Sequence, residues 1–220
     1  MTIHSSTQSS CMICLVRHGE TSWNAERRLQ GHIDIPLNHR GVAQAESTAR
    51  SMADVHFAAM YSSDLQRAHD TARAIANRRA QQPRTDPRLR ERHYGVFQGL
   101  TYDEASARFP EAYARFKARD IVQPIPGDGE SLATFATRVT EALAEIAQRH
   151  AGARVLVVTH GGVLDIAHRL AAGKPLHTAR DFTIPNAALN WIEHEAGQWR
   201  LLDWGDERHL ADALDELPTT

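Results

Sequence analysis

Apolar and polar positions form two kinds of pattern along the chain. Short continuous apolar runs predict buried strands, and longer segments with apolar residues three or four positions apart predict helices. We expect strands at 11–16, 57–61 and 154–159, and a terminal hairpin made of 187–194 and 199–203. We expect helices at 41–52, 65–79, 131–150 and 162–171, and two short helices within 101–117 that separate at Pro110. Strands and helices therefore alternate along most of the chain.

This alternation indicates an α/β fold. Continuous apolar strands are typical of a parallel sheet that helices cover on both faces. We therefore expect a three-layer α/β/α sandwich with a mainly parallel mixed sheet. The chain shows no internal repeat and no low-complexity linker, so we expect a flexible arm over 1–10 and a single domain over 11–220. The proline- and glycine-rich stretch 120–129 is expected to be a loop, either beside a site or a plain connection.

Composition limits the kinds of partner. The formal net charge of the 220 residues is -2, so no global basic field favours nucleic acid, and an anion site has to be a local cluster of positive groups. The two cysteines, Cys11 and Cys14, lie in an apolar run that predicts a strand, where residues three apart point to opposite faces. We expect buried cysteines rather than a redox pair, and neither these nor the 13 histidines form a metal signature.

The ends of the chain bear on location and assembly. Residues 1–10 lack the basic and apolar parts of a signal peptide, and no apolar run reaches the roughly 20 residues that span a bilayer. We therefore expect a cytoplasmic protein without a membrane partner. The terminal hairpin offers a sheet edge, which leaves a homodimer as an open alternative. The acidic tail from Asp203 is expected to be a solvated end, with closure over a pocket as the alternative.

Three of the predicted strands end in residues that suit phosphate chemistry. Arg17 and His18 follow the first strand, Arg67 lies shortly after the second, and His160 follows the third. In an open α/β sheet, ligands bind beyond the carboxyl ends of the strands, so these side chains are expected to meet around one pocket. Arginine forks match phosphate oxygens, and an imidazole can act as a nucleophile. Taken singly, each residue has an ordinary explanation as a surface or capping group, and their convergence is what favours a site.

The motifs in which these residues occur resemble those of the histidine phosphatase superfamily, the phosphoglycerate mutase-like group, and are closest to its bacterial B-type members. The resemblance covers nearly the whole chain. It rests on Leu15-Val16-Arg17-His18-Gly19-Glu20-Thr21, Trp23-Asn24, Asp34-Ile35-Pro36-Leu37, Ser63-Asp64-Leu65-Gln66-Arg67-Ala68, Leu89-Arg90-Glu91, Gly129-Glu130-Ser131 and Thr159-His160-Gly161-Gly162.

The resemblance implies a catalytic role for five residues. His18 matches the nucleophile that becomes phosphorylated, so it must be neutral, and its other ring nitrogen should donate to a fixed acceptor. Arg17 and Arg67 match the phosphate clamps, and His160 matches a donor to the phosphoryl oxygens. Glu91 matches the general acid that protonates the leaving oxygen.

Further matches concern phosphate and substrate binding. Asn24 and the backbone near Gly161 match phosphate contacts, and Gln30 and Gly31 lie where members of the group contact substrate. The chain departs from the commonest pattern of phosphatases in the group at 97–99, which reads Phe-Gln-Gly where many relatives have Trp-Glu-Gly. This departure concerns the wall of the pocket.

The resemblance leaves three functions open. The chain could hydrolyse small phosphorylated metabolites without a cofactor, or interconvert 3- and 2-phosphoglycerate as a mutase that uses 2,3-bisphosphoglycerate. A weaker alternative is a non-catalytic module that binds phosphate groups or phosphoproteins. Mutases of the cofactor-dependent type carry a longer insertion between the acid and the Gly-Glu-Ser segment, whereas here the stretch from Glu91 to Gly129 is short and lightly basic. We therefore favour the hydrolase, which needs no metal.

Overall fold

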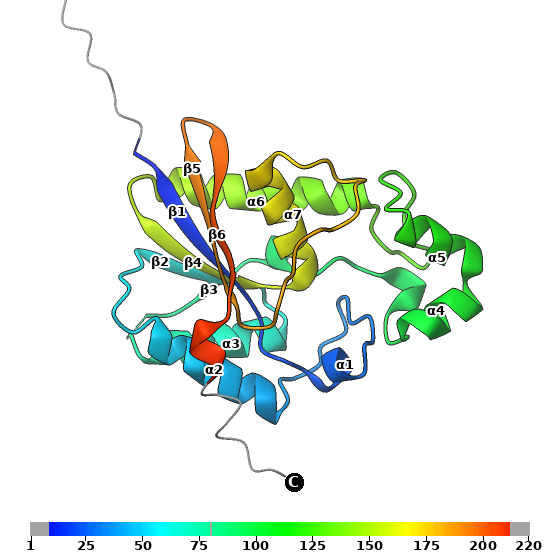
Figure 1. The fold of residues 1–220 in the computed structure, drawn as a ribbon, viewed down its shortest axis with the longest axis horizontal. Helices are drawn as coiled ribbons and strands as arrows, with labels where there is room; N and C mark the ends of the chain where they lie inside the picture. Colours follow the sequence, from blue (N-terminus) through cyan, green and yellow to red (C-terminus); the bar gives the residue numbers. More distant parts are fainter. Residues whose placement is uncertain (1–8, 80, 212–220) are drawn as a thin grey trace, which may run out of the picture.

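A twisted six-stranded sheet forms the centre of the molecule (Figure 1). The computed structural model describes residues 9–79 and 81–211. The strand order is β3-β2-β4-β1-β5-β6. The strands are β1 Cys11–Arg17, β2 Ala59–Ser62, β3 Arg84–Thr85, β4 Arg154–Thr159, β5 Leu189–Glu195 and β6 Gln198–Asp206. The first four are mutually parallel, whereas β5 is antiparallel to β1 and β6 is antiparallel to β5. The expected mainly parallel mixed sheet is confirmed.

Helices cover both faces of this sheet. The helices are α1 Ser22–Ala25, α2 His39–Ser51, α3 Gln66–Asn77, α4 Tyr102–Arg108, α5 Pro110–Lys117, α6 Leu132–Arg149 and α7 Gly161–Ala172. Three 3-10 turns, η1 Pro87–Leu89, η2 Gly95–Phe97 and η3 Arg208–Leu210, complete the elements of the described residues. Two cores result, one between the sheet and α6 and α7, and one between the sheet and α2 and α3. The three-layer arrangement is therefore the one that the sequence predicts.

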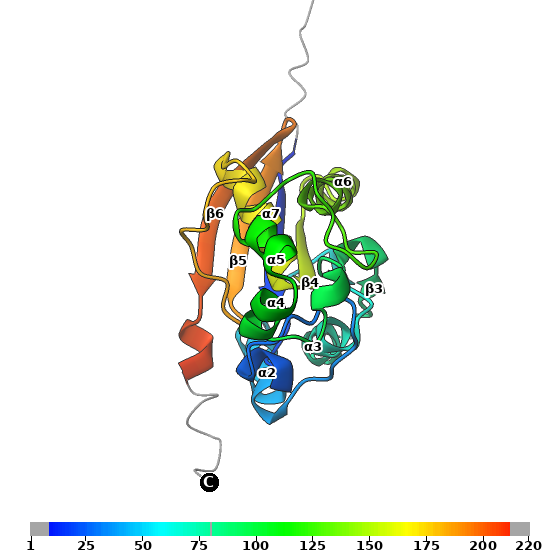
Figure 2. The same ribbon diagram turned by 90° about the vertical axis from the view of Figure 1, so that its right-hand side faces the viewer.

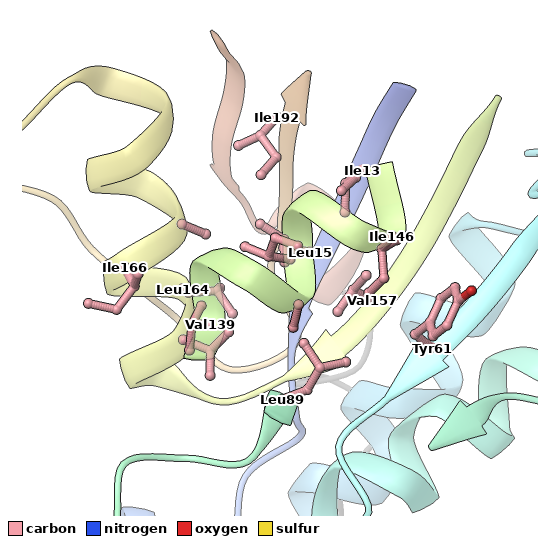
Figure 3. Packing of buried hydrophobic residues seen from close by; sticks show 14 of the residues in the cluster. Ile13, Leu15, Tyr61, Leu89, Val139, Ile146, Val157, Leu164, Ile166 and Ile192 are labelled. Atoms are coloured by element: carbon pink, nitrogen blue, oxygen red, sulfur yellow. The ribbon is translucent and has the colours of Figure 1, made fainter. Parts of the chain in front are cut away.

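The alternation of side chains along β1 explains the two cores. Cys11, Ile13 and Leu15 belong to the core under α6 and α7, whereas Cys14 and Val16 belong to the core over α2 and α3. Figure 3 shows Ile13 and Leu15 on the first of these faces. Both cysteines are free and buried, and burial raises the pKa of the Cys11 thiol to about 11. They are therefore packing residues, as expected from their spacing.

The helices α4 and α5 stand apart from the three layers. Figure 1 places them at the right of the molecule, beyond α1, and Figure 2 views the molecule from that side. They enclose a third, aromatic-rich cluster around Leu29 and Phe97. The loop 120–129 packs against it, since the Val96 N–H donates to the carbonyl of Pro126 over 2.8 Å. The helices and this loop therefore form a lobe beside the sheet.

Several boundaries differ from the expected ones for local reasons. The short α1 was not expected, because its four residues are too few for a periodic pattern, although Thr21 and Asn24 form a capping box. The two-residue β3 is too short for any strand pattern. The hairpin turns at Ala196 and Gly197, whose φ values are 51° and 79°, and β6 continues to Asp206, three residues beyond its expected end.

The two ends of the chain are described only in part. Most of the expected N-terminal arm, 1–8, and the last residues, 212–220, lie outside the described residues. The described part of the tail runs along β5 and then packs on α2, where Thr48 Oγ1 lies 3.1 Å from His209 Nε2. Closure of the tail over a pocket therefore finds no support in residues 203–211. In the described part of the chain no helix is long and apolar enough to cross a membrane.

Candidate active site

The carboxyl ends of β1 and β4 lie side by side, and a histidine follows each of them. Arg17 is in register with Thr159, and the backbone N–H of His18 donates to the carbonyl of Thr159 over 2.9 Å. The rings of His18 and His160 consequently face each other, with centroids 5.2 Å apart and ring planes at 60°. Parallel pairing thus joins two histidines that are far apart in the sequence.

The hydrogen bonding of His18 fixes which nitrogen is free. Its Nδ1 lies 2.7 Å from the carbonyl oxygen of Gly19. A carbonyl only accepts, so Nδ1 carries the hydrogen and Nε2 keeps its lone pair in the neutral ring. Burial lowers the pKa of His18 well below its ordinary value, and the positive charges of Arg67 and Arg17 lower it further. A Cβ at position 19 would overlap the carbonyl oxygen of Gly41, so this turn requires glycine.

Two arginines, the buried Arg67 and the half-buried Arg17, flank the histidines with part of their donors unused. Arg67, in the first turn of α3, donates to the carbonyls of Ile33 and Gly31 over 2.9 and 2.8 Å. Arg17 donates to the carbonyl of Ile184 over 2.7 Å. Among the described residues neither Nε–H has a partner. Burial lowers the pKa of Arg67 to about 10, which still leaves its guanidinium positively charged at neutral pH.

His160 is the N-cap residue of α7, and the described residues provide no partner for either of its ring nitrogens. The side chain is completely buried, and burial, together with Arg67, lowers its pKa well below the ordinary value. Buried polar atoms rarely remain without a hydrogen bond. The N-terminus of α7 also favours negative charge. An anion at this position would supply the missing partner.

Glu91 reaches the same place from the segment after η1. Its Oε1 accepts from the backbone N–H of Arg92 over 2.8 Å, and its Oε2 accepts from the N–H of Gly162 over 3.0 Å. A Cβ at position 162 would overlap the carboxylate, so the second glycine after His160 makes room for Glu91. The carboxyl group is thereby anchored to the start of α7, two residues after His160.

A small compartment of about 80 Å³ collects most of the predicted site residues. Its lining includes Arg17, His18, Asn24, Gln30, Arg67 and Glu91, together with Leu29 and two tyrosines. The remaining three predicted residues, His160, Gly161 and Gly31, do not line it. The ring of His160 lies next to that of His18, and Gly161 lines a larger neighbouring cavity together with Arg17. The structure thus gathers the predicted residues in one region of the molecule.

The predicted binding residues differ in what they present. Gln30 is buried and its Oε1 has no partner among the described residues. Asn24 uses its Oδ1 to accept from the backbone N–H of Thr21, which anchors α1. Gly31 contributes its carbonyl to Arg67 rather than contacting the compartment, and a Cβ there would overlap Gln98 Oε1. Gln98, where the chain departs from the commonest pattern, therefore contacts Gly31 and does not line the compartment. Its Oε1 also accepts from the backbone N–H of His32 over 2.8 Å.

One residue that the sequence patterns do not single out holds the acid segment. Arg138 of α6 donates to the carbonyls of Arg88, Arg90 and Glu91 over 2.8, 2.9 and 2.9 Å. Its guanidinium also binds both carboxylate oxygens of Glu130 over 2.7 Å. We call these contacts the Arg138 clamp. The motif containing Glu130 is visible in the sequence, but Arg138 belongs to no motif and its role appears only in the fold.

Two other contacts were also not expected. Asn186 Nδ2 donates to the carbonyl of His18 over 2.8 Å. His32 Nε2 donates to the carbonyl of Glu91 over 2.8 Å. Both bonds join segments that are distant in sequence, so no local pattern could reveal them. They fix the backbone on which the two proposed reacting groups are carried.

Titratable side chains elsewhere do not form a metal cluster in the part of the chain that is described. No group of three or more histidine, cysteine, aspartate or glutamate side chains is placed to hold a metal ion among residues 9–79 and 81–211. The positive charge at the compartment comes from the arginines.

Comparison with known proteins identifies the family. The model of the histidine phosphatase superfamily (branch 1) matches residues 13–207. The chain is 42% identical over 206 residues to the metal-independent phosphoserine phosphatase of Arabidopsis thaliana, which covers 90% of this chain and 83% of that protein. It is 36% identical over 211 residues to the probable phosphoglycerate mutase GpmB of Enterobacter sp. (strain 638), covering 93% of this chain and 98% of that protein.

A solved structure agrees with both sequence matches. The protein YhfR of Bacillus stearothermophilus superposes with a TM-score of 0.85 at 34% sequence identity, covering 91% of this chain and 99% of that one. The match of the family model spans all the motifs quoted from 15 to 162, so the resemblance seen in the sequence is confirmed. The chain belongs to branch 1 of the histidine phosphatase superfamily.

Proposed function

We propose that this enzyme of the histidine phosphatase type hydrolyses phosphate monoesters of small metabolites through a phosphohistidine formed on His18. The observation that carries the proposal is the compartment in which a neutral imidazole with a free Nε2 stands between two arginines and a carboxyl group. The described residues leave both arginine Nε–H groups without partners. The oxygens of a phosphoryl group in this space would accept hydrogen bonds from those N–H groups. The name of the phosphoserine phosphatase relative supports hydrolysis and a reaction without metal.

In the first step, His18 Nε2 attacks phosphorus and the bond from phosphorus to the ester oxygen breaks. The electron pair goes to the leaving oxygen, and Glu91 in its protonated form delivers a proton there, so that an alcohol departs. The attacking ring becomes positively charged, and the Gly19 carbonyl that accepts from Nδ1 stabilises this charge. Arg17, Arg67 and the start of α7 face the charge on the phosphoryl oxygens.

In the second step, water attacks the phosphorus of the phosphohistidine. Glu91, now a carboxylate, takes a proton from this water, and the phosphorus–nitrogen bond breaks with its electron pair returning to Nε2. Inorganic phosphate leaves, and both His18 and Glu91 regain their starting forms. Water must therefore reach the compartment, and the neighbouring cavity of about 770 Å³, which Glu91 also lines, supplies the path.

Mutase activity is the second candidate, because the chain is similar to a probable phosphoglycerate mutase. The same His18 would then return its phosphoryl group to a glycerate hydroxyl rather than to water. The two reactions share the first step and differ only in the acceptor. The wide cavity beside Glu91 favours water as the acceptor.

The proposal is tested by replacing the nucleophile. His18→Ala should lower the rate of phosphate release from p-nitrophenyl phosphate by at least about a thousandfold, because no other group replaces an attacking nitrogen. Rapid quenching into alkaline detergent after mixing with a ³²P-labelled substrate should show a labelled histidine in the wild type and none in the variant, because phosphohistidine is stable in alkali and hydrolyses in acid.

His177→Ala is the matched control, since His177 is exposed and lines no part of the compartment. This control should retain wild-type turnover and labelling. Hydrolysis at an undiminished rate by the His18 variant would rule out His18 as the nucleophile.

A further inference from the structure

The position of Glu91 indicates where the alcohol part of a substrate lies. Two wide cavities, of about 770 and 710 Å³, adjoin the small compartment and share Arg17. Glu91 lines the cavity of about 770 Å³ but not the cavity of about 710 Å³. If Glu91 protonates the leaving oxygen, as the proposed function requires, the alcohol extends into the larger cavity. We call this space, lined by Glu91, Phe116, Phe182, Arg119 and Asp165 among others, the leaving-group cavity.

The leaving-group cavity is much larger than a three-carbon alcohol needs, and its walls carry many rings. Ligand pockets for whole small molecules typically measure roughly 300–1,000 Å³. Aromatic side chains come to it from α5, from α6, from the segment after α7 and from the segments that precede η2 and open α4. They are Tyr94, Tyr102, Phe116, Phe135 and Phe182. Such walls favour a ligand that presents a flat face of its own.

Phe182 is held in place from behind. Its ring stacks on His168 with centroids 3.5 Å apart and planes at 14°, and Trp204 meets it edge-on with centroids 6.0 Å apart. Trp204 is itself fixed, because its Nε1–H donates to the carbonyl of Thr183 over 2.9 Å. One face of Phe182 is thus covered by His168, the guanidinium of Arg169 and the ammonium of Lys174 each lie over the ring at 5.8 Å from its centroid, and the half-buried side chain lines the cavity.

Phe116, in the lobe formed by α4 and α5, is also held in place by neighbouring rings. It meets Tyr94 edge-on with centroids 6.0 Å apart and Phe97 with centroids 5.7 Å apart. Phe97 is completely buried within the aromatic-rich cluster under α4 and α5. The ring of Phe116 therefore needs no ordering when a ligand arrives, which lowers the entropic cost of binding.

A polar pair stands among these rings. Arg119 Nη2 donates to Asp165 Oδ2 over 2.6 Å, Arg119 Nε donates to the carbonyl of Leu176, and Arg169 Nε donates to the same Asp165 oxygen over 3.2 Å. The second carboxylate oxygen, Asp165 Oδ1, has no partner among the described residues, and the side chain is buried. A ring hydroxyl would supply the missing donor after a small shift of the side chain. Lys117 and Arg180 line both wide cavities, so their charges do not distinguish between them.

We propose that the preferred substrates are phosphate monoesters of ring-bearing alcohols. The ring lies against Phe182 and Phe116, and a polar substituent of the ring points to Asp165. Aromatic rings and sugar rings share this chemistry, because both present a face that packs on an aromatic side chain. Phe182 is then a specificity-determining residue, which acts on the alcohol and not on the phosphoryl group.

The test compares alkyl phosphates whose leaving alcohols have similar acidity. The ring-bearing pair is benzyl phosphate and glucose 6-phosphate, and the open-chain pair is glycerol 3-phosphate and O-phosphoserine. Wild-type kcat/KM should be at least about tenfold higher for one of the ring-bearing esters, and the better of the two identifies the kind of ring. Phe182→Leu should lower kcat/KM for that ester about fivefold through KM, and leave the open-chain esters within about twofold.

Trp199→Leu is the matched control, because Trp199 lies on the terminal hairpin outside the cavity. It should alter none of the four values, and thermal unfolding should show that both variants are folded. Open-chain esters that react as well as the ring-bearing pair, or an equal loss for all four in Phe182→Leu, would overturn the ring preference while hydrolysis itself stands. Absence of His18-dependent hydrolysis of every ester would overturn the proposed function and the preference with it.

Discussion

At the scale of single residues, the environment of His18 determines its chemistry. A histidine in water is protonated in part near pH 6.5 and then cannot attack phosphorus. Here burial, Arg67 and Arg17 favour the neutral ring, and the Gly19 carbonyl selects the tautomer with Nε2 free. His160 is neutral for the same reasons. The motif in the sequence names these residues, but only their surroundings give them a defined protonation state.

The lowered pKa values of the two histidines predict how stability depends on pH. Below about pH 6.5 the imidazoles of the unfolded chain bind protons, whereas the folded protein keeps His18 and His160 neutral. The free energy of unfolding should therefore fall as the pH decreases from about 6.5, by about 1 kcal/mol per histidine at pH 5.5. Urea denaturation of the wild type and of His160→Gln at pH 7.5 and 5.5 measures this effect.

The variant lacks one of the two buried imidazoles. It should accordingly lose less unfolding free energy than the wild type between the two pH values, whatever its stability at pH 7.5. Identical losses for the two proteins would show that His160 binds protons equally in the folded and unfolded states.

At the scale of elements, the Arg138 clamp links α6 to the segment that carries Glu91. Every donor group that Arg138 uses is directed at the carbonyls of 88–91 or at Glu130. The clamp therefore sets the backbone position of Glu91, and the N–H groups of Arg92 and Gly162 then orient its carboxylate. Arg138 does not line the compartment, so it is a positioning residue.

Replacement of Arg138 should affect the acid step more than the attack by His18. Arg138→Met should lower kcat for glycerol 3-phosphate by about tenfold to a hundredfold, because a displaced acid no longer protonates a poor leaving group. The loss for p-nitrophenyl phosphate, which needs little protonation, should stay within about threefold. Steady-state kinetics with both substrates measures the difference.

Arg149→Met is the matched control on the same helix, since among the described residues Arg149 forms its one ion pair with Glu145, away from the acid segment. It should change neither rate. Arg138→Lys should fail to restore the rate, because an ammonium cannot reproduce a planar fork that spans three carbonyls. Equal losses for the two substrates in Arg138→Met would point to a general structural defect instead of a displaced acid.

At the scale of the whole molecule, the lobe formed by α4 and α5 controls how open the site is. Only the 3-10 turn η2, two short helices and the loop 120–129 separate the acid from Ser131, the N-cap residue of α6. The two wide cavities that adjoin the compartment lie beside these elements. A mutase must exclude water from its phosphohistidine, and cavities of this size admit it. The architecture therefore favours hydrolysis over transfer to a second hydroxyl.

The balance between the two reactions can be measured directly. With 3-phosphoglycerate as substrate, phosphate release should exceed formation of 2-phosphoglycerate by at least about tenfold, because water is the more abundant acceptor. Phosphate and both phosphoglycerates are quantified by ³¹P NMR, with and without 2,3-bisphosphoglycerate. Faster interconversion that 2,3-bisphosphoglycerate stimulates would establish the mutase reaction.

The predictable part of the fold is the part that local patterns encode. The apolar run of β4 predicts that strand at its observed bounds, and Pro110 separates α4 from α5 as expected. The short elements α1 and β3 were not predicted, because four or two residues carry no periodic signal. The homodimer remains an open alternative, and the single domain over 11–220 remains a prediction.

The sequence by itself determined the order of the longer elements, the family, and the residues that follow the strand ends. Each of these depends on neighbouring positions, such as the apolar period of a strand or the Arg17-His18-Gly19 motif. The tertiary structure alone decided the tautomer of His18, the Arg138 clamp on Glu91, and which of two cavities Glu91 borders. These features are hydrogen bonds and spaces between groups that only folding brings together, so their geometry has no counterpart in any local stretch of sequence.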